Sequence, residues 1–196
     1  MQRKRRGPVL LLQLANLVSG VGNAVVTLAV PWLVLEETGS ATAAGAVAAV
    51  SALPALVAAP ITGWLIDHLG RPTVSVVADI LSALAVAAKP ILAATVGLSY
   101  GLILALAVVG AVFDPAGYSA RRAIIPDAAA PAEMDVDQLN GIHQGVWLSG
   151  WTLGPLFGTW LIAAFGAVDA FSVPAGLFVV AALAVALMRV CDSGQD

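Results

Sequence analysis

Long apolar runs separated by short polar breaks make up most of the chain. Taking about 20 apolar residues as the length that crosses a bilayer, the pattern predicts six membrane-spanning helices. Their expected limits are 8–36, 40–66, 72–95, 99–122, 137–165 and 168–190. We therefore expect an all-α membrane protein with a single transmembrane domain over residues 1–196 and a cytoplasmic connector at about 123–136.

The composition agrees with a membrane protein. Of the 196 residues, 60% are hydrophobic and 11% are charged, whereas a soluble domain carries about 25% charged residues. The single cysteine, Cys191, excludes an internal disulfide and a cysteine-built metal site. The sequence indicates no cofactor, no metal site and no nucleic-acid partner, and we expect the lipid bilayer to surround the chain.

Basic residues predict the orientation of the bundle. Six spans bring both termini to the same side, and eight of the nine basic residues fall on that side. Because positive charges concentrate in cytoplasmic segments, we expect a multi-pass cell-membrane protein with both termini in the cytoplasm. The residues concerned are Arg3, Lys4, Arg5, Arg6, Arg71, Arg121, Arg122 and Arg189.

Polar residues line one face of two of the expected spans. Their helical spacing puts the members of each set on a common side. Such faces either pack on neighbouring helices or line a water-filled cavity, and both readings stay open. The candidate pathway residues are Gln13, Asn16, Asn23 and Thr27 in the first span, and Asn140, Gln144, Trp147 and Trp151 in the fifth.

Two charged residues lie within the third span. A charge at mid-membrane costs at least ~2.5 kcal/mol, so Asp79 requires a partner, a hydrated cavity or a proton, and it is the candidate intramembrane proton site. Lys89 lies further along the same helix, and we expect its long side chain to reach the outer surface.

A short polar segment, residues 63–71, joins the second and third expected spans. Gly63 and Gly70 permit a tight turn, while Asp67 is placed to accept hydrogen bonds from helix N-terminal amides or from Arg71. Asp114, near the end of the fourth span, is expected at a depth where it could meet Arg71. The segment is either a conformational latch or an ordinary cytoplasmic turn, and Asp114 is either its third member or a structural anchor.

The fifth span carries glycines at four-residue intervals. Gly150, Gly154 and Gly158 form a flat seam on which another helix can approach closely, and Pro155 stiffens and bends it.

The turn and the seam together resemble motifs of the major facilitator superfamily of secondary transporters. Gly63, Leu65, Asp67, Gly70 and Arg71 match the superfamily's loop between its second and third helices, and the seam resembles an element of its fifth helix associated with antiporters. Further positions resemble the branch that contains macrolide, tetracycline-type and siderophore exporters: Thr38-Gly39-Ser40, Gly45, Leu53-Pro54, Pro60, Phe113-x-Pro115-Ala116, Ala120, Pro126 and Leu139-Asn140.

The chain also departs from that pattern. His68 and Pro72 stand where basic residues are usual in the loop, and Thr159 replaces the last glycine of the seam. Asn23 stands where these exporters often place an acid, the fourth span has no mid-membrane arginine, and the chain has six expected helices where the family has twelve. These differences reduce the expected support for proton coupling and for transport by the chain alone.

The resemblance implies the N-terminal half of a major facilitator fold, belonging to a proton-coupled efflux transporter of small amphipathic compounds. Because the family's substrate path lies between two six-helix halves, such a half requires a second half or self-association. A non-transporting, truncated partner of a full-length transporter is the alternative. A remote alternative is an intramembrane serine protease, because Gly97-Leu98-Ser99-Tyr100-Gly101 fits a nucleophile pattern; however, we expect His143 and His68 at the opposite side of the membrane from Ser99.

Overall fold

The computed structural model describes residues 6–188, apart from the side chains of residues 55–59, and contains only helices in this part of the chain. The long helices are α1 (Gly7–Thr38), α2 (Ala41–Leu69), α3 (Arg71–Thr95), α4 (Tyr100–Ala123) and α6 (Val136–Phe165). Shorter elements are α5 (Ile125–Ala132), the 3-10 helix η1 (Asp169–Phe171) and α7 (Ser172–Ala186). The N-terminal basic residues 1–5, Arg189 and Cys191 lie outside the described residues.

Five stretches of the described chain are long and apolar enough to cross a membrane. They are α1, α3, the α4–α5 stretch Tyr100–Ala132, α6, and the η1–α7 stretch Asp169–Ala186. Within α2, the described apolar stretch is the shorter segment Ala41–Pro54. The chain is therefore a multi-pass membrane protein by the length and composition of its helices.

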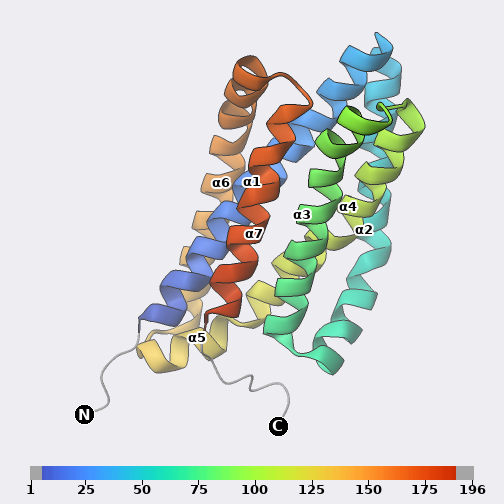
Figure 1. Ribbon diagram of the computed structural model, residues 1–196. Helices are drawn as coiled ribbons and strands as arrows, with labels where there is room; N and C mark the ends of the chain where they lie inside the picture. Colours follow the sequence, from blue (N-terminus) through green and yellow to red (C-terminus); the bar gives the residue numbers. More distant parts are fainter. Residues whose placement is uncertain (1–5, 189–196) are drawn as a thin grey trace.

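The helices form one bundle with α1 running obliquely through it. Figure 1 shows α6 and α7 beside the first half of α1, with α2, α3 and α4 grouped on the other side. Helix α1 packs on α6 and α7 and also reaches α2, whereas α3 packs on α4 and α7. The start of α1, the end of α7 and α5 all lie at one end of the bundle, which we call the α5 end (Figure 1).

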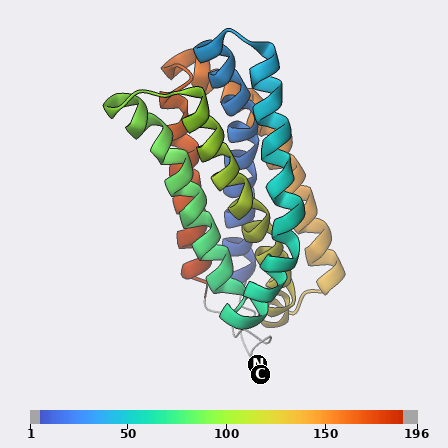
Figure 2. The same ribbon diagram turned by 90° about the vertical axis from the view of Figure 1, so that its right-hand side faces the viewer.

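Local sequence signals explain where the helices begin and turn. Ser40 caps α2 by accepting a hydrogen bond from the amide of Ala43 at 3.2 Å, as its position before an apolar run predicts. Gly70 separates α2 from α3 with a φ of 84°, a conformation that L side chains rarely adopt. In the view of Figure 2, α3 and α4 are joined at the end of the bundle opposite to α5.

The connector between α4 and α6 is helical over most of its length. Ile125, Ala128, Ala129 and Ala132 of α5 are buried in a cluster with apolar residues of α1, α6 and α7. Because its apolar face packs against these helices, α5 is part of the bundle and holds the α5 end together.

Candidate functional site: a cavity between four helices

A cavity of about 390 Å³ lies between α1, α2, α4 and α6. Its polar and aromatic lining residues are Asn23, Thr27, Ser51, Asp114, Tyr118, Trp147 and Trp151. A few polar groups among aromatic and small apolar side chains are typical of sites that bind small organic molecules.

A narrower cavity of about 120 Å³ continues from the first one toward α3. The two cavities share the lining residues Thr27, Ala48, Ser51, Ala111 and Asp114, and the narrow one also reaches Lys89. Together they fall within the size range of about 300–1,000 Å³ that drug-sized ligands occupy.

Asp114 lies at the junction of the two cavities. Its Oδ1 accepts a hydrogen bond from the hydroxyl of Ser82 on α3 at 2.6 Å, and its side chain lines both parts of the cavity. The structure thus places Asp114 inside the bundle against α3, and within the described residues no hydrogen bond or ion pair joins it to Arg71.

Lys89 of α3 is buried and lines the narrow cavity. Only 1% of its surface is exposed; its Nζ donates to the carbonyl oxygen of Ala85 at 3.3 Å and lies 5.1 Å from the centre of the Phe171 ring. The expectation that Lys89 extends to the outer surface is wrong. Phe171 of η1 covers the amine and gives it a cation–π contact, which offsets part of the cost of burial.

A second pair of charges lies in the same bundle but away from the cavity. Arg121 of α4 donates from Nη1 to Oδ2 of Asp79 at 2.6 Å and from Nη2 to the hydroxyl of Ser19 at 2.8 Å. Ser19 in turn donates to Oδ1 of Asp79 at 3.2 Å. All three residues are buried, so the network links α1, α3 and α4 through charge-assisted hydrogen bonds. Asp79 has the partner that its depth requires, and its role as a proton site stays a prediction.

Aromatic residues of α4 and α6 form one wall of the cavity. The rings of Tyr118 and Trp147 lie 4.4 Å apart, and those of Trp147 and Trp151 lie 6.1 Å apart. The Tyr118 hydroxyl donates to Oε1 of Gln144 at 2.9 Å, which fixes the ring against the wall.

The candidate pathway residues separate into two groups. Asn23 and Thr27 of α1 line the cavity together with Trp147 and Trp151 of α6. Asn16, by contrast, is fully buried near the α5 end, where its Nδ2 donates to the carbonyl oxygen of His143 at 2.7 Å. The remaining three, Gln13, Asn140 and Gln144, are not among the residues that line the two cavities.

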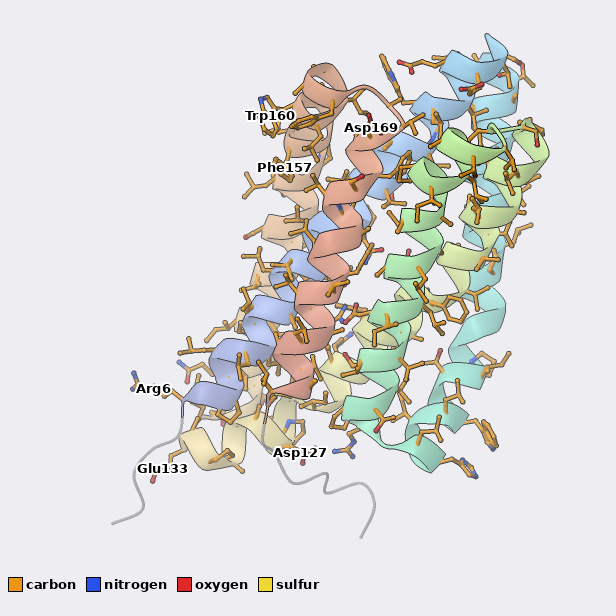
Figure 3. The ribbon with its side chains drawn as sticks, viewed as in Figure 1. Arg6, Asp127, Glu133, Phe157, Trp160 and Asp169 are labelled. Atoms are coloured by element: carbon orange, nitrogen blue, oxygen red, sulfur yellow. The ribbon has the colours of Figure 1, made fainter. Side chains whose placement is uncertain are left out.

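The predicted latch segment makes a different contact from the one expected. Arg71 donates from Nη1 to Oδ2 of Asp127 on α5 at 2.9 Å, while Asp67 is exposed. Figure 3 shows Asp127 at the α5 end of the bundle. The ion pair therefore connects the start of α3 to α5, and within the described residues no hydrogen bond or ion pair joins Asp67 to Arg71 or Asp114. Gly63 is exposed and has open space around it.

The glycine seam of α6 faces α1. A Cβ on Gly150 would lie 3.1 Å from the amide nitrogen of Val21, and one on Gly158 would lie 3.4 Å from Cδ2 of Leu28. A Cβ on Gly154 would overlap that of Ala24. Pro155 lies beside this line and is exposed. Trp160, on the outward side of α6, is also exposed, whereas Phe157 is half-buried (Figure 3).

The nucleophile-like pattern at Ser99 is a helix start. The Ser99 hydroxyl accepts a hydrogen bond from the amide of Leu102 and so caps α4. His143, the candidate base, lies in α6 near the α5 end, the opposite end of the bundle from the α3–α4 turn. No base reaches Ser99 among the described residues, so the geometry gives the protease alternative no support.

Sequence reasoning gave no correct role to several residues of the cavities and of the buried charge network. It placed Tyr118 and Ser51 in no role, left Lys89 at the surface, and counted Arg121 only as a cytoplasmic charge. The signal for two of them was present, because Lys89 and Arg121 lie in or next to apolar spans where a charge demands compensation. Tyr118 and Ser51 carry no such signal.

Known proteins with similar sequences match nearly the whole chain. The family model of the Major Facilitator Superfamily matches residues 12–195. The chain is 41% identical over 197 residues to a multidrug efflux pump Tap of Mycolicibacterium fortuitum, covering 99% of this chain and 48% of the relative. It is 37% identical over 198 residues to the multidrug efflux pump Tap of Mycobacterium tuberculosis H37Rv, covering 100% of this chain and 47% of the relative.

The chain thus spans about half the length of the curated relatives that it matches. The family match covers far more than half of the chain and includes the turn, the cavity and the seam. The chain belongs to the major facilitator superfamily of membrane transporters.

Proposed function

We propose that the chain acts as the N-terminal six-helix half of an efflux transporter for small amphipathic compounds, driven by protons, with both termini in the cytoplasm. In this proposal α2 crosses the membrane together with the five stretches identified above. The observation that carries the proposal is the cavity between α1, α2, α4 and α6, because it combines aromatic side chains with charged and hydrogen-bonding groups inside a membrane bundle.

Polar and aromatic residues exposed at one side of the cavity support the need for a second half. Trp151 is 38% exposed although it lines the cavity, and Thr27 and Gln144 are exposed on the same side of the bundle. Indole, hydroxyl and amide groups of this kind are costly to leave against lipid. A second six-helix body, from another chain or from a second copy, would cover them and provide the opposite wall of the pathway.

The relatives support export as the direction of transport in this proposal. Two proteins called multidrug efflux pumps contain a segment that aligns with nearly all of this chain. Since that segment is only about half of each relative, export by the assembled protein is inferred from the relatives' names together with the chemistry of the cavity.

The proposal is tested by adding the missing half. The chain is expressed alone and together with the C-terminal half of the Mycolicibacterium fortuitum relative, and accumulation of a panel of fluorescent amphipathic compounds is followed in whole cells. We expect reduced accumulation only when both halves are present, and loss of the effect when a protonophore collapses the proton gradient. Export by purified monomeric chain in liposomes, or unchanged accumulation with a well-folded pair of halves, would contradict the proposal.

The orientation is tested separately with Cys191. A membrane-impermeant maleimide should leave this cysteine unlabelled in intact cells and label it after permeabilisation. Strong labelling of intact cells would place the C-terminus outside.

A further inference from the structure

Asp79, Lys89, Asp114 and Arg121 carry charges inside the bundle, and they fall into two kinds. Asp79 and Arg121 neutralise each other directly, with 2.6 Å between Oδ2 and Nη1. Lys89 and Asp114 both line the narrow cavity and form no ion pair with each other or with any other described residue. The cavity therefore presents one positive and one negative group to whatever occupies it.

We propose that Lys89 and Asp114 form a two-charge site for aromatic amphoteric compounds, meaning compounds that carry both an acidic group and an amine. The acidic group binds at Lys89, the protonated amine binds at Asp114, and the aromatic body lies against Trp147, Trp151 and Tyr118. This inference rests on the proposed function for the claim that the ligand is transported, and it deepens that function by naming the substrate class.

The hydrogen bonds of Lys89 leave room for an acidic group. An ammonium group has three donors, and only one of them is used by a described residue, in the 3.3 Å contact with the Ala85 carbonyl oxygen. The hydroxyl of Ser51, which lines the same cavity, is buried without a hydrogen-bond partner. A carboxylate or similar acid at the narrow end would satisfy both residues, because its oxygens accept from ammonium and hydroxyl groups.

Asp114 is oriented to accept from a ligand. Ser82 donates to its Oδ1 and so fixes the carboxylate, while Oδ2 accepts no hydrogen bond from the described residues. Because Asp114 lines both cavities, it lies between Lys89 and the aromatic wall. A ligand amine next to its aromatic body would meet this carboxylate, and the faces of Trp147 and Trp151 would favour the same positive charge.

The charge balance selects amphoteric compounds over simple ions. A cation that neutralises Asp114 leaves the charge of Lys89 without a counter-ion in the bundle, and an anion at Lys89 leaves Asp114 in the same state. An uncompensated charge is costly in a low-dielectric interior. A ligand with both groups compensates both residues and keeps the total charge of the site unchanged.

The first test needs no variant. The purified full chain in nanodiscs is equilibrated by dialysis at pH 7 with three probes, using empty nanodiscs to subtract lipid partitioning. The probes are norfloxacin, which carries an amine and a carboxylate; norfloxacin methyl ester, which retains only the amine; and nalidixic acid, which retains only the acid. We expect norfloxacin to bind at least tenfold more tightly than either of the others. Equal binding of norfloxacin and its ester, or no binding of norfloxacin, would overturn the proposal.

Two substitutions assign the charges to the residues. Lys89→Met should weaken norfloxacin binding about tenfold and should not weaken binding of its ester, because no uncompensated ammonium group then remains beside the bound amine. Asp114→Asn should weaken norfloxacin binding about tenfold and should not weaken binding of nalidixic acid, because no uncompensated carboxylate then remains beside the bound acid. Asp127→Asn is the matched control, since this acid lies on α5 outside both cavities, and it should alter no probe.

The outcomes remain separable from those of the transport experiment. Each variant is accepted only if it elutes as a single species in size-exclusion chromatography, and either substitution alone suffices to test its own residue. A variant that weakens all three probes equally contradicts the assignment of charges. Selective binding by a chain whose paired form exports nothing would reject the transport function and retain the site.

Discussion

The two acid–base pairs inside this bundle, Asp79 with Arg121 and Asp114 with Lys89, differ in what surrounds them. Asp79 and Arg121 are in direct contact, share Ser19, and line neither cavity. Asp114 and Lys89 line a cavity and contact only neutral groups, which are Ser82 for Asp114 and the Ala85 carbonyl and the Phe171 ring for Lys89. A pair that is already satisfied contributes to the structure, whereas a pair held apart around a cavity is available to a ligand. An acid and a base on neighbouring helices can therefore either stabilise the fold, as Asp79 and Arg121 do, or remain available to a ligand, as we propose for Asp114 and Lys89.

The largest decrease in stability is expected when the ion pair of Asp79 and Arg121 is broken. Asp79→Asn leaves the Arg121 guanidinium buried without a counter-charge, and breaking a buried pair in this way costs about 3–5 kcal/mol. We expect a large decrease in folded protein, measured by the midpoint of SDS-induced unfolding and by recovery as a single species from detergent. The double variant Asp79→Leu with Arg121→Leu should recover much of the loss, and failure to do so would show that the pair does more than neutralise itself.

A smaller effect is expected at the third member of that network. Ser19→Ala removes one acceptor of Arg121 and one donor to Asp79, and leaving such a buried group without its partner costs about 1–3 kcal/mol. The change is measured in the same SDS unfolding experiment. Ser149→Ala is the matched control, because that hydroxyl is exposed and donates only to the Gly145 carbonyl of its own helix. If both variants unfold alike, Ser19 is not part of the network in solution.

The ion pair at the α5 end should contribute less to stability than the pair of Asp79 and Arg121. Arg71 and Asp127 are 24% and 5% exposed, so a double-mutant cycle should give a coupling of about 1 kcal/mol that decreases with added salt. Asp127→Asn should then lower stability more than Asp67→Asn, the reverse of what the turn motif predicts. The opposite ranking would restore Asp67 as the partner of Arg71.

The smallest effect on stability is expected at the cavity. Asp114→Asn makes the same chemical change as Asp79→Asn, but Asn retains an oxygen for the Ser82 hydroxyl and its surroundings are open to water or ligand. We expect a decrease in the SDS midpoint well below that of Asp79→Asn, because the substitution breaks no direct ion pair and only removes a negative charge from the cavity that Lys89 also lines. A loss as large as that of Asp79→Asn would mean that both pairs are structural and would remove the distinction between them.

The glycine seam shows a case in which the pattern along the chain was sufficient. Spacing of four residues places Gly150, Gly154 and Gly158 on one line of a helix whatever the surrounding fold is, and the structure puts that line against α1. The cap at Ser40 is similar, since it depends on residues within one turn.

What the sequence determined by itself is the class of protein: a helical membrane protein, its family, and the residues whose charge requires compensation. These follow from local properties, namely hydropathy, helical periodicity and motif spacing. Only the tertiary structure decided which charge meets which partner. The contacts of Asp79 with Arg121, of Arg71 with Asp127 and of Asp114 with Ser82 join residues 42, 56 and 32 positions apart. No periodicity within one helix specifies such pairs, because they depend on how the helices are rotated and tilted against one another.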